Sequence, residues 1–301
     1  MLLLLVTVAA AQAQDFTYTN NNGAVTITGY TGSGGNVTIP STIVGLPVTS
    51  ISGDAFHLRP DLTSVTIPDS VTNIEDGSYY KGGGFGTFIA CTGLTNVAIG
   101  KGVMHIGIGA FQTCTGLTII TIPQSVISIG DFAFANCSGL SKVTVGKSVA
   151  KIGNDDLGGN DLGYVFAECT NLVAIYFQGN EPVFTSNPQF AHPSSFFDDN
   201  KATVYYLPNT TGWGSTVEGR PAVLWNPEAQ TNDGSFGVRQ SGFGFDIAGT
   251  PDIPIVVEGC TSLTSQSWVA LQSCTLTNGL IHFSDAQWTN YPTRVYRIQS
   301  P

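Results

Sequence analysis

The feature that most constrains this chain is a pattern of apolar, glycine and cysteine positions that recurs at a fixed step. Val97 is followed 23 positions later by Ile120, and Phe111 by Phe134. The whole pattern moves by this step: Val97, Ile99, Val103, Ile106, Gly107, Ala110, Phe111, Cys114 and Leu117 recur as Ile120, Ile122, Val126, Ile129, Gly130, Ala133, Phe134, Cys137 and Leu140. Self-similarity at a fixed period of this length predicts a repeat protein.

Further copies on both sides keep the pattern but carry insertions. Ile39 precedes Ile67 by 28 positions, and Ile67 precedes Ile99 by 32. The copy that starts at Val143 also carries an insertion before its phenylalanine. Five copies therefore run from Val37 to Phe177, with a base period of 23 positions that is lengthened by 5 or 9.

Each copy has the composition of one turn of a coil. Val97 and Ile99 alternate with polar positions, which indicates a strand, and a Pro or Gly after the strand ends it. Ala110, Phe111 and Cys114 follow at the spacing of a helical turn. A lone copy buries too few apolar groups to offset the entropy of ordering it, so the copies must stack on one another. The sequence thus predicts a mainly β solenoid.

The repeat resembles the BspA-type, or Treponema-type, bacterial leucine-rich repeat, whose unit reads approximately L-x-x-[VI]-x-[IV]-P-x-x-[VI]-x-x-I-G-x-x-A-F-x-x-C. The resemblance covers residues 37–177. It implies a curved leucine-rich-repeat solenoid of about five to six units, found on secreted or cell-surface bacterial proteins. Such proteins serve in adhesion or recognition and have no catalytic activity.

The sequence outside the repeats predicts caps and a second module. Residues 14–227 are expected to form the solenoid with its caps, which include a β-hairpin over 16–30, a loop over 182–200 and a last strand over 202–208. Residues 228–234 are interpreted as a linker, and residues 235–301 as a small β-sandwich-like module. Its short alternating strands are expected at 242–248, 253–259, 268–272, 280–284 and 294–299.

The first residues have the composition of a secretory signal peptide. Leu2–Ala11 is an apolar run, and Ala11-Gln12-Ala13 has the form of a cleavage site. We therefore expect residues 1–13 to be removed and the mature chain to start at Gln14. No later run has the length of a transmembrane segment. The expected location is extracellular or on a bacterial cell surface.

Charge and motif content argue against several function classes. The chain has 11 Lys and Arg against 21 Asp and Glu, a net charge of −10, so it lacks the basic surface that nucleic acids or anionic membranes require. The four histidines are isolated in sequence, and no G-x-S-x-G motif is present. We expect no enzyme activity, cofactor or metal. Asp155, Asp156 and Asp161 are interpreted as part of a solvated loop rather than a calcium site.

The six cysteines fall into two groups. Cys91, Cys114, Cys137 and Cys169 share one repeat position and are expected to be buried thiols that act as small apolar side chains. Cys260 and Cys274 lie 14 positions apart in the C-terminal module. In an exported protein these two residues could be bridged or free, and the sequence leaves this open.

The candidate ligand-binding residues come from the insertions and from one strand. The two longer insertions, Glu75–Thr87 and Asn154–Val165, fall at the same repeat position and so emerge on one side of the solenoid, which is often the binding side. The first carries Tyr79, Tyr80, Lys81 and Phe85. Tyr176 ends a column of outward strand positions that is otherwise rich in threonine.

Two functions remain open at this stage. The first is a monomeric recognition or adhesion protein that binds a protein or a glycan through its solenoid. The alternative is a carbohydrate-binding accessory protein of extracellular polysaccharide degradation, which would use the C-terminal module. An aromatic strip on that module would favour the alternative.

Overall fold

The computed structural model describes residues 15–77, 79–80, 83–84, 86–153, 163–185, 195–240, 242–264 and 267–299, with backbone alone at 79–80 and 83–84. The chain forms two compact units, which we call the solenoid and the C-terminal module. Along the chain, the boundary between the two units falls between Ala222 and Val223. The predicted signal peptide, residues 1–13, lies outside the described residues.

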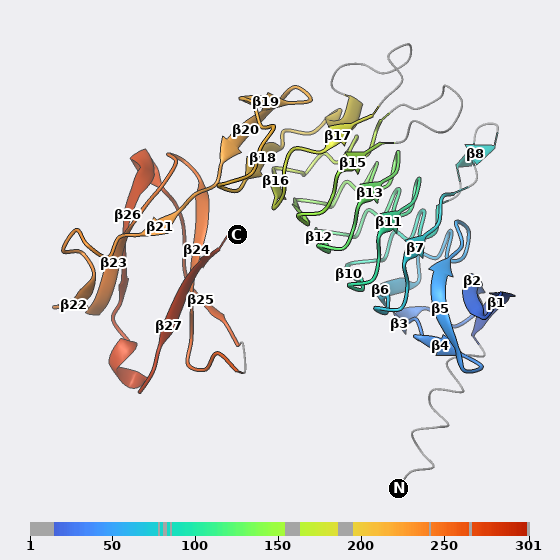
Figure 1. The fold of residues 1–301 in the computed structure, drawn as a ribbon, viewed down its shortest axis with the longest axis horizontal. Helices are drawn as coiled ribbons and strands as arrows, with labels where there is room; N and C mark the ends of the chain where they lie inside the picture. Colours follow the sequence, from blue (N-terminus) through green and yellow to red (C-terminus); the bar gives the residue numbers. More distant parts are fainter. Residues whose placement is uncertain are drawn as a thin grey trace, which may run out of the picture. The chain divides into compact units, whose positions relative to one another are not determined.

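One face of the solenoid, the VTI face, carries the Val-Thr-Ile strands of the repeats (Figure 1). Its first sheet consists of β3 (Gly35–Thr38), β6 (Leu62–Thr66) and β10 (Asn96–Ala98). A second sheet has the order β12 (Ile119–Ile122), β14 (Lys142–Val145), β16 (Ala174–Phe177), β18 (Thr203–Tyr206), β20 (Arg220–Leu224) and β19 (Thr216–Val217). The repeat strands pair in parallel, so that Ile120, Val143, Ile175 and Val204 lie side by side.

The opposite sheet, which we call the IG face, contains β5 (Leu46–Ile51), β7 (Asn73–Ile74), β11 (His105–Ile106), β13 (Ser128–Ile129), β15 (Lys151–Ile152) and β17 (Val183–Phe184). The short strands β11, β13 and β15 precede the glycine of the Ile-Gly motif, and the other strands continue this column. The antiparallel hairpin of β1 (Phe16–Asn21) and β2 (Ala24–Tyr30) closes one end, because β2 pairs with β5. The short strand β4 (Thr42–Ile43) also pairs with β5.

A column of phenylalanine rings runs through the core of the solenoid. Phe56, Phe88, Phe111, Phe134, Phe166 and Phe197 stack with centroid distances of 4.8 to 6.1 Å. Tyr30 of the N-terminal hairpin stacks on Phe56 at 5.3 Å. The regular recurrence of phenylalanine in the sequence thus becomes a continuous apolar column, and its rings are almost completely buried.

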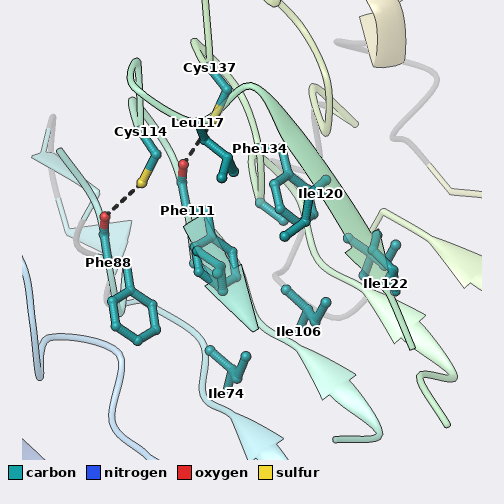
Figure 2. Close-up of a cluster of buried hydrophobic side chains, with 14 of the residues drawn as sticks. Ile74, Phe88, Ile106, Phe111, Cys114, Leu117, Ile120, Ile122, Phe134 and Cys137 are labelled. Carbon is teal, nitrogen blue, oxygen red and sulfur yellow. Dashed lines mark hydrogen bonds between the residues drawn. The ribbon is translucent and has the colours of Figure 1, made fainter. Parts of the chain in front are cut away.

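The repeat cysteines tie each coil to the preceding one. The thiols of Cys114 and Cys137 donate to the carbonyl oxygens of Phe88 and Phe111 at 3.2 and 3.1 Å (Figure 2). Cys91 and Cys169 make the same bond to Phe56 and Phe134. Burial raises the pKa of Cys91 to about 11 and that of Cys169 to about 12, so the thiols remain protonated donors. The predicted column of buried thiols is confirmed.

The repeat pattern continues for one coil beyond the last copy recognised in the sequence. The sequence predicts a loop over residues 182–200, but the 3₁₀ helix η1 (Ser195–Phe197) places Phe197 on the aromatic column. Asn200 occupies the position of the cysteine. Its amide donates to the carbonyl of Phe166 at 3.1 Å and accepts from the backbone N–H of Ala202 at 3.1 Å.

The C-terminal module consists of two antiparallel sheets. One contains β21 (Glu228–Ala229), β22 (Gly237–Arg239), β23 (Gly242–Ala248) and β26 (Leu280–Asp285), and the other β24 (Pro254–Cys260), β25 (Val269–Thr275) and β27 (Val295–Gln299). Phe283 of the first sheet lies 5.5 Å from Tyr296 of the second, between ring centroids. Each of the five predicted strands begins within one residue of its expected start.

The structure corrects one sequence-based expectation for the C-terminal module and answers one question that the sequence left open. The predicted linker 228–234 begins with β21, because Glu228 pairs with Ala248 of β23. The open question of a Cys260–Cys274 disulfide is answered by the strand register. Cys274 pairs with Ile255, which is about 16 Å along the strand from Cys260. This separation is far beyond disulfide reach, and both cysteines are free.

The mainly β leucine-rich-repeat solenoid that the sequence predicts is confirmed. The helices in the described part of the chain are short 3₁₀ turns. None of them has the length and apolar character needed to cross a membrane.

Candidate functional site

A groove of about 460 Å³ lies on the IG face of the solenoid. It crosses β7, β11, β13 and β15, and so extends over successive coils. The lining residues are Asn73, Ile74, Glu75, Asp76, His105, Ile106, Gly107, Ser128, Gly130, Lys151 and Gly153. We call this hollow the IG groove.

The glycines of the repeat motif that line the groove allow its coils to stack closely. A Cβ atom on Gly107 would lie 2.4 Å from the backbone of Glu75, and one on Gly130 would lie 2.7 Å from the backbone nitrogen of Ile108. Such distances are shorter than real Cβ contacts, so close stacking of the coils requires glycine here.

A polar column forms one wall of the IG groove. The parallel register aligns Asn73, His105, Ser128 and Lys151, the first residues of four neighbouring strands. His105 Nδ1 and Ser128 Oγ lie 2.8 Å apart and are hydrogen-bonded. The buried Oδ1 of Asn73 has no hydrogen-bond partner within the described part of the chain.

Charge is distributed unevenly along the groove. Glu75 and Asp76 lie at the end near β7, and Lys151 lies on β15 at the other end. Asp76 Oδ1 accepts a hydrogen bond from the backbone N–H of Ile108 at 2.9 Å, which fixes the carboxylate. The groove thus has an acidic end, a neutral polar middle and a basic end.

Both long insertions begin at the rim of the IG groove. The first follows Glu75 and Asp76, and the second follows Gly153, which lines the groove. Parts of the first insertion belong to the coil, because Gly77 donates to the carbonyl of Ile108 and Thr87 is completely buried. The groove therefore lies on the side of the solenoid that the insertion pattern predicts for binding.

The first insertion contains a short antiparallel pair, β8 (Tyr79–Tyr80) and β9 (Gly83–Gly84). The backbone of Tyr79 and Tyr80 is therefore placed on a hairpin next to the acidic end of the groove. Their side chains, and the candidate residues Lys81 and Phe85, lie outside what the structure describes. Asp155, Asp156 and Asp161 of the second insertion also lie outside it.

Tyr176, the remaining candidate, lies on the VTI face and not with the insertions. Its ring stacks on Tyr205 with centroids 4.9 Å apart and an angle of 15°. Only 6% of the residue is exposed, and this burial raises the pKa of its hydroxyl. The structure thus does not bring Tyr176 together with the insertion residues, and its ring is already packed.

A smaller hollow of about 280 Å³ lies on the turn side of the last coils. Glu168 and Asp199 occupy equivalent turn positions, and both have left-handed backbone conformations. A hydrogen bond with Asp199, together with repulsion from Asp199 and Asp198, raises the pKa of Glu168. No group of three or more His, Cys, Asp or Glu side chains within the described ranges could hold a metal ion.

Sequence reasoning missed the groove residues because they are 23 or 32 positions apart. Asn73 and His105 are separated by a lengthened repeat, whereas His105, Ser128 and Lys151 follow the base period. The available signal was the polar residue immediately before the second isoleucine of each copy, which is followed by glycine after His105, Ser128 and Lys151 and by Glu75 after Asn73. A second contact of a histidine with a polar side chain was also missed: His282 Nδ1 lies 2.6 Å from Asp246 Oδ1 in the C-terminal module.

Stacked coils with two parallel strand faces, an aromatic column and a groove over successive repeats define the first unit as a leucine-rich-repeat solenoid. A model of the BspA type leucine rich repeat region matches residues 32–83 and 84–192, in six copies. This match spans more than half of the chain. The chain therefore belongs to the BspA-type leucine-rich-repeat family.

Several solved structures are similar to this chain. The leucine rich repeat protein of T. pallidum is 25% identical, with a TM-score of 0.48 over 65% of this chain and 86% of that one. A leucine-rich repeat protein from Bacteroides capillosus is 28% identical, with a TM-score of 0.37 over 44% and 94%. A leucine rich cell surface protein from Faecalibacterium prausnitzii is 20% identical, with a TM-score of 0.28 over 70% and 71%. The comparison with curated proteins gave no match.

Proposed function

We propose that this chain is a secreted or cell-surface recognition protein that binds its ligand, a protein or a glycan, through the IG groove without catalysis and as a monomer. The observation that carries the proposal is the coincidence of the groove with the rim of both insertions. Insertions at one repeat position line one side of a solenoid, and recognition commonly uses that side. The groove adds fixed polar groups and an unpaired acceptor at Asn73.

Export is part of the proposal and rests on residues 1–13. An apolar run followed by Ala11-Gln12-Ala13 fits recognition and cleavage by a signal peptidase. N-terminal sequencing of protein recovered from the culture medium or cell envelope should start at Gln14. Recovery of the uncleaved chain in the cytoplasm alone would contradict this part of the proposal.

Binding can be tested with a glycan array and a panel of extracellular proteins, probed with the chain from Gln14 onward. A first variant should replace residues 78–85 with two glycines, which keeps the buried Thr87 in place. Shortening a surface loop costs little stability, since loop closure changes by only about 0.6 kcal/mol per doubling of length. Ligand capture should be lost while the melting temperature stays within a few degrees.

A second variant tests the aromatic residues of the same loop. The double change Tyr79→Ala with Tyr80→Ala should lower affinity by at least about 2 kcal/mol if the aromatic rings anchor the ligand. Thr121→Ala on the VTI face serves as the control. Unchanged binding by both loop variants would contradict a role of the first insertion in recognition.

The structure gives less support to carbohydrate binding by the C-terminal module. Sugar rings pack on free aromatic faces, but the guanidinium of Arg297 lies 4.3 Å from the ring centre of Trp268. Arg294 lies 4.1 Å from the ring centre of Tyr291 in the same way. Arg297 is held in place by Glu258 at 2.7 Å. One face of each of these two rings is therefore already covered.

A further inference from the structure

An exposed apolar column lies directly beside the polar wall of the IG groove. It consists of Met104, Ile127 and Ala150, each one residue before the groove residues His105, Ser128 and Lys151. Met104 is 37% exposed and Ile127 is 42% exposed. Backbone hydrogen bonds stack the three positions, from Ile127 N to Met104 O at 2.7 Å and from Ala150 N to Ile127 O at 2.9 Å. We call this column the apolar ridge.

The core does not need the apolar ridge. The residues just before it, Val103, Val126 and Val149, point inward and are buried. Ridge side chains on the outside leave apolar surface in water at three successive coils, although polar residues would suit a solvated position. A contiguous exposed apolar strip rimmed by polar groups marks an interaction surface.

The chemistry of this face favours a protein partner over a glycan. No Phe, Tyr or Trp side chain is present among the described residues of the ridge or the groove lining, whereas glycan sites depend on such rings for stacking. Aliphatic side chains beside fixed polar groups instead match the apolar core and polar rim of a protein interface. The acidic end at Glu75 and Asp76 and the basic end at Lys151 give the partner a direction.

We propose that the apolar ridge and the IG groove together bind an extended segment of another protein, laid across the strands. Its apolar side chains pack on Met104 and Ile127, a basic side chain faces Glu75 and Asp76, and an acidic side chain faces Lys151. Neighbouring strands are about 4.8 Å apart, so the three ridge positions span roughly 10 Å, which is about three residues of extended chain. This inference rests on the proposed function and names the class of its ligand.

The probe for the test is a random peptide-display library, selected on the chain from Gln14 onward, with a glycan array probed in parallel. Selected peptides should carry a basic residue, apolar residues and an acidic residue in that order. The best one is then synthesised and its Kd measured. Ile127→Lys should weaken binding at least tenfold, and Thr121→Lys on the VTI face should leave it unchanged. Both sites are exposed, so melting temperatures verify that each variant folds.

Charge reversal tests the direction of binding. Glu75→Lys should weaken the selected peptide, and replacing the basic residue of the peptide with glutamate should restore binding to that variant. Peptides that bind independently of Ile127→Lys overturn this inference but leave recognition by the solenoid standing. Glycan binding that is lost in Ile127→Lys would also overturn the inference of a protein ligand, but it would support recognition by the solenoid. Failure to select any peptide and any glycan contradicts both.

Discussion

Removal of one ring from the aromatic column should be costly because the column cannot close over the gap. Phe134 is completely buried and lies between Phe111 at 5.4 Å and Phe166 at 5.5 Å. Strand pairing on both faces fixes the spacing of the coils, so the neighbouring rings cannot move together. Phe→Ala changes in cores cost about 3–5 kcal/mol, and a cavity that persists places Phe134→Ala in the upper part, about 4–5 kcal/mol.

The assay is hydrogen exchange under increasing urea, followed by mass spectrometry, because it reports the solenoid peptides separately from the C-terminal module. Thr121→Ala is the matched control, since Thr121 is an exposed residue of the same coil. This variant should lose less than about 0.5 kcal/mol of unfolding free energy. Similar losses for the two variants would refute the assignment of inward and outward positions. A loss below about 1 kcal/mol for Phe134→Ala would show that the stack relaxes, contrary to the fixed spacing.

Three further predictions concern the last coil, the turn side and the IG groove. Asn200→Ala should cost about 2–4 kcal/mol of unfolding free energy in urea melts, because it leaves the Phe166 carbonyl and the Ala202 N–H buried without partners. An unchanged urea midpoint would contradict the structural role of Asn200 in the last coil. Glu168→Gln should raise the melting temperature at neutral pH, because the raised pKa of Glu168 means that native stability falls as pH rises through the carboxyl range. The benefit of the substitution must vanish below the ordinary pKa of glutamate, and a benefit at all pH values would argue against repulsion by Asp199. Gly130→Ala should cost about 1–3 kcal/mol through backbone overpacking, whereas Gly214→Ala, where a Cβ meets only ordinary contacts, should have little effect in the same melts.

Local sequence determined the coil itself. Alternation of apolar and polar residues decides which side chains of a short strand point inward, and this property needs no knowledge of distant residues. For that reason the sequence predicts Val97, Phe111 and Cys114 in the core correctly, as it does the five strands of the C-terminal module. The repeat period then required stacking, because one coil cannot bury enough apolar surface alone.

Lateral neighbours were decided by the tertiary structure. His105 and Ser128 form a hydrogen bond only because the parallel register places equivalent residues side by side, and the coils stack closely there because Gly107 and Gly130 have no side chain. The same principle decided the cysteines of the C-terminal module, where Cys274 faces Ile255 and not Cys260. Register depends on the alignment of whole strands.

The last coil shows the boundary between the two kinds of information. Phe197 and Asn200 keep the spacing of the Phe-x-x-Cys motif, but the exchange of cysteine for asparagine and the preceding insertion conceal the repeat in the sequence. In the folded chain, Asn200 donates to the carbonyl of Phe166 in the preceding coil, as the cysteines do elsewhere, and it also accepts from the N–H of Ala202. The sequence determined that the coils must stack, and the tertiary structure showed that Asn200 replaces the thiol in the last coil, because a buried backbone carbonyl needs a donor whichever side chain supplies it.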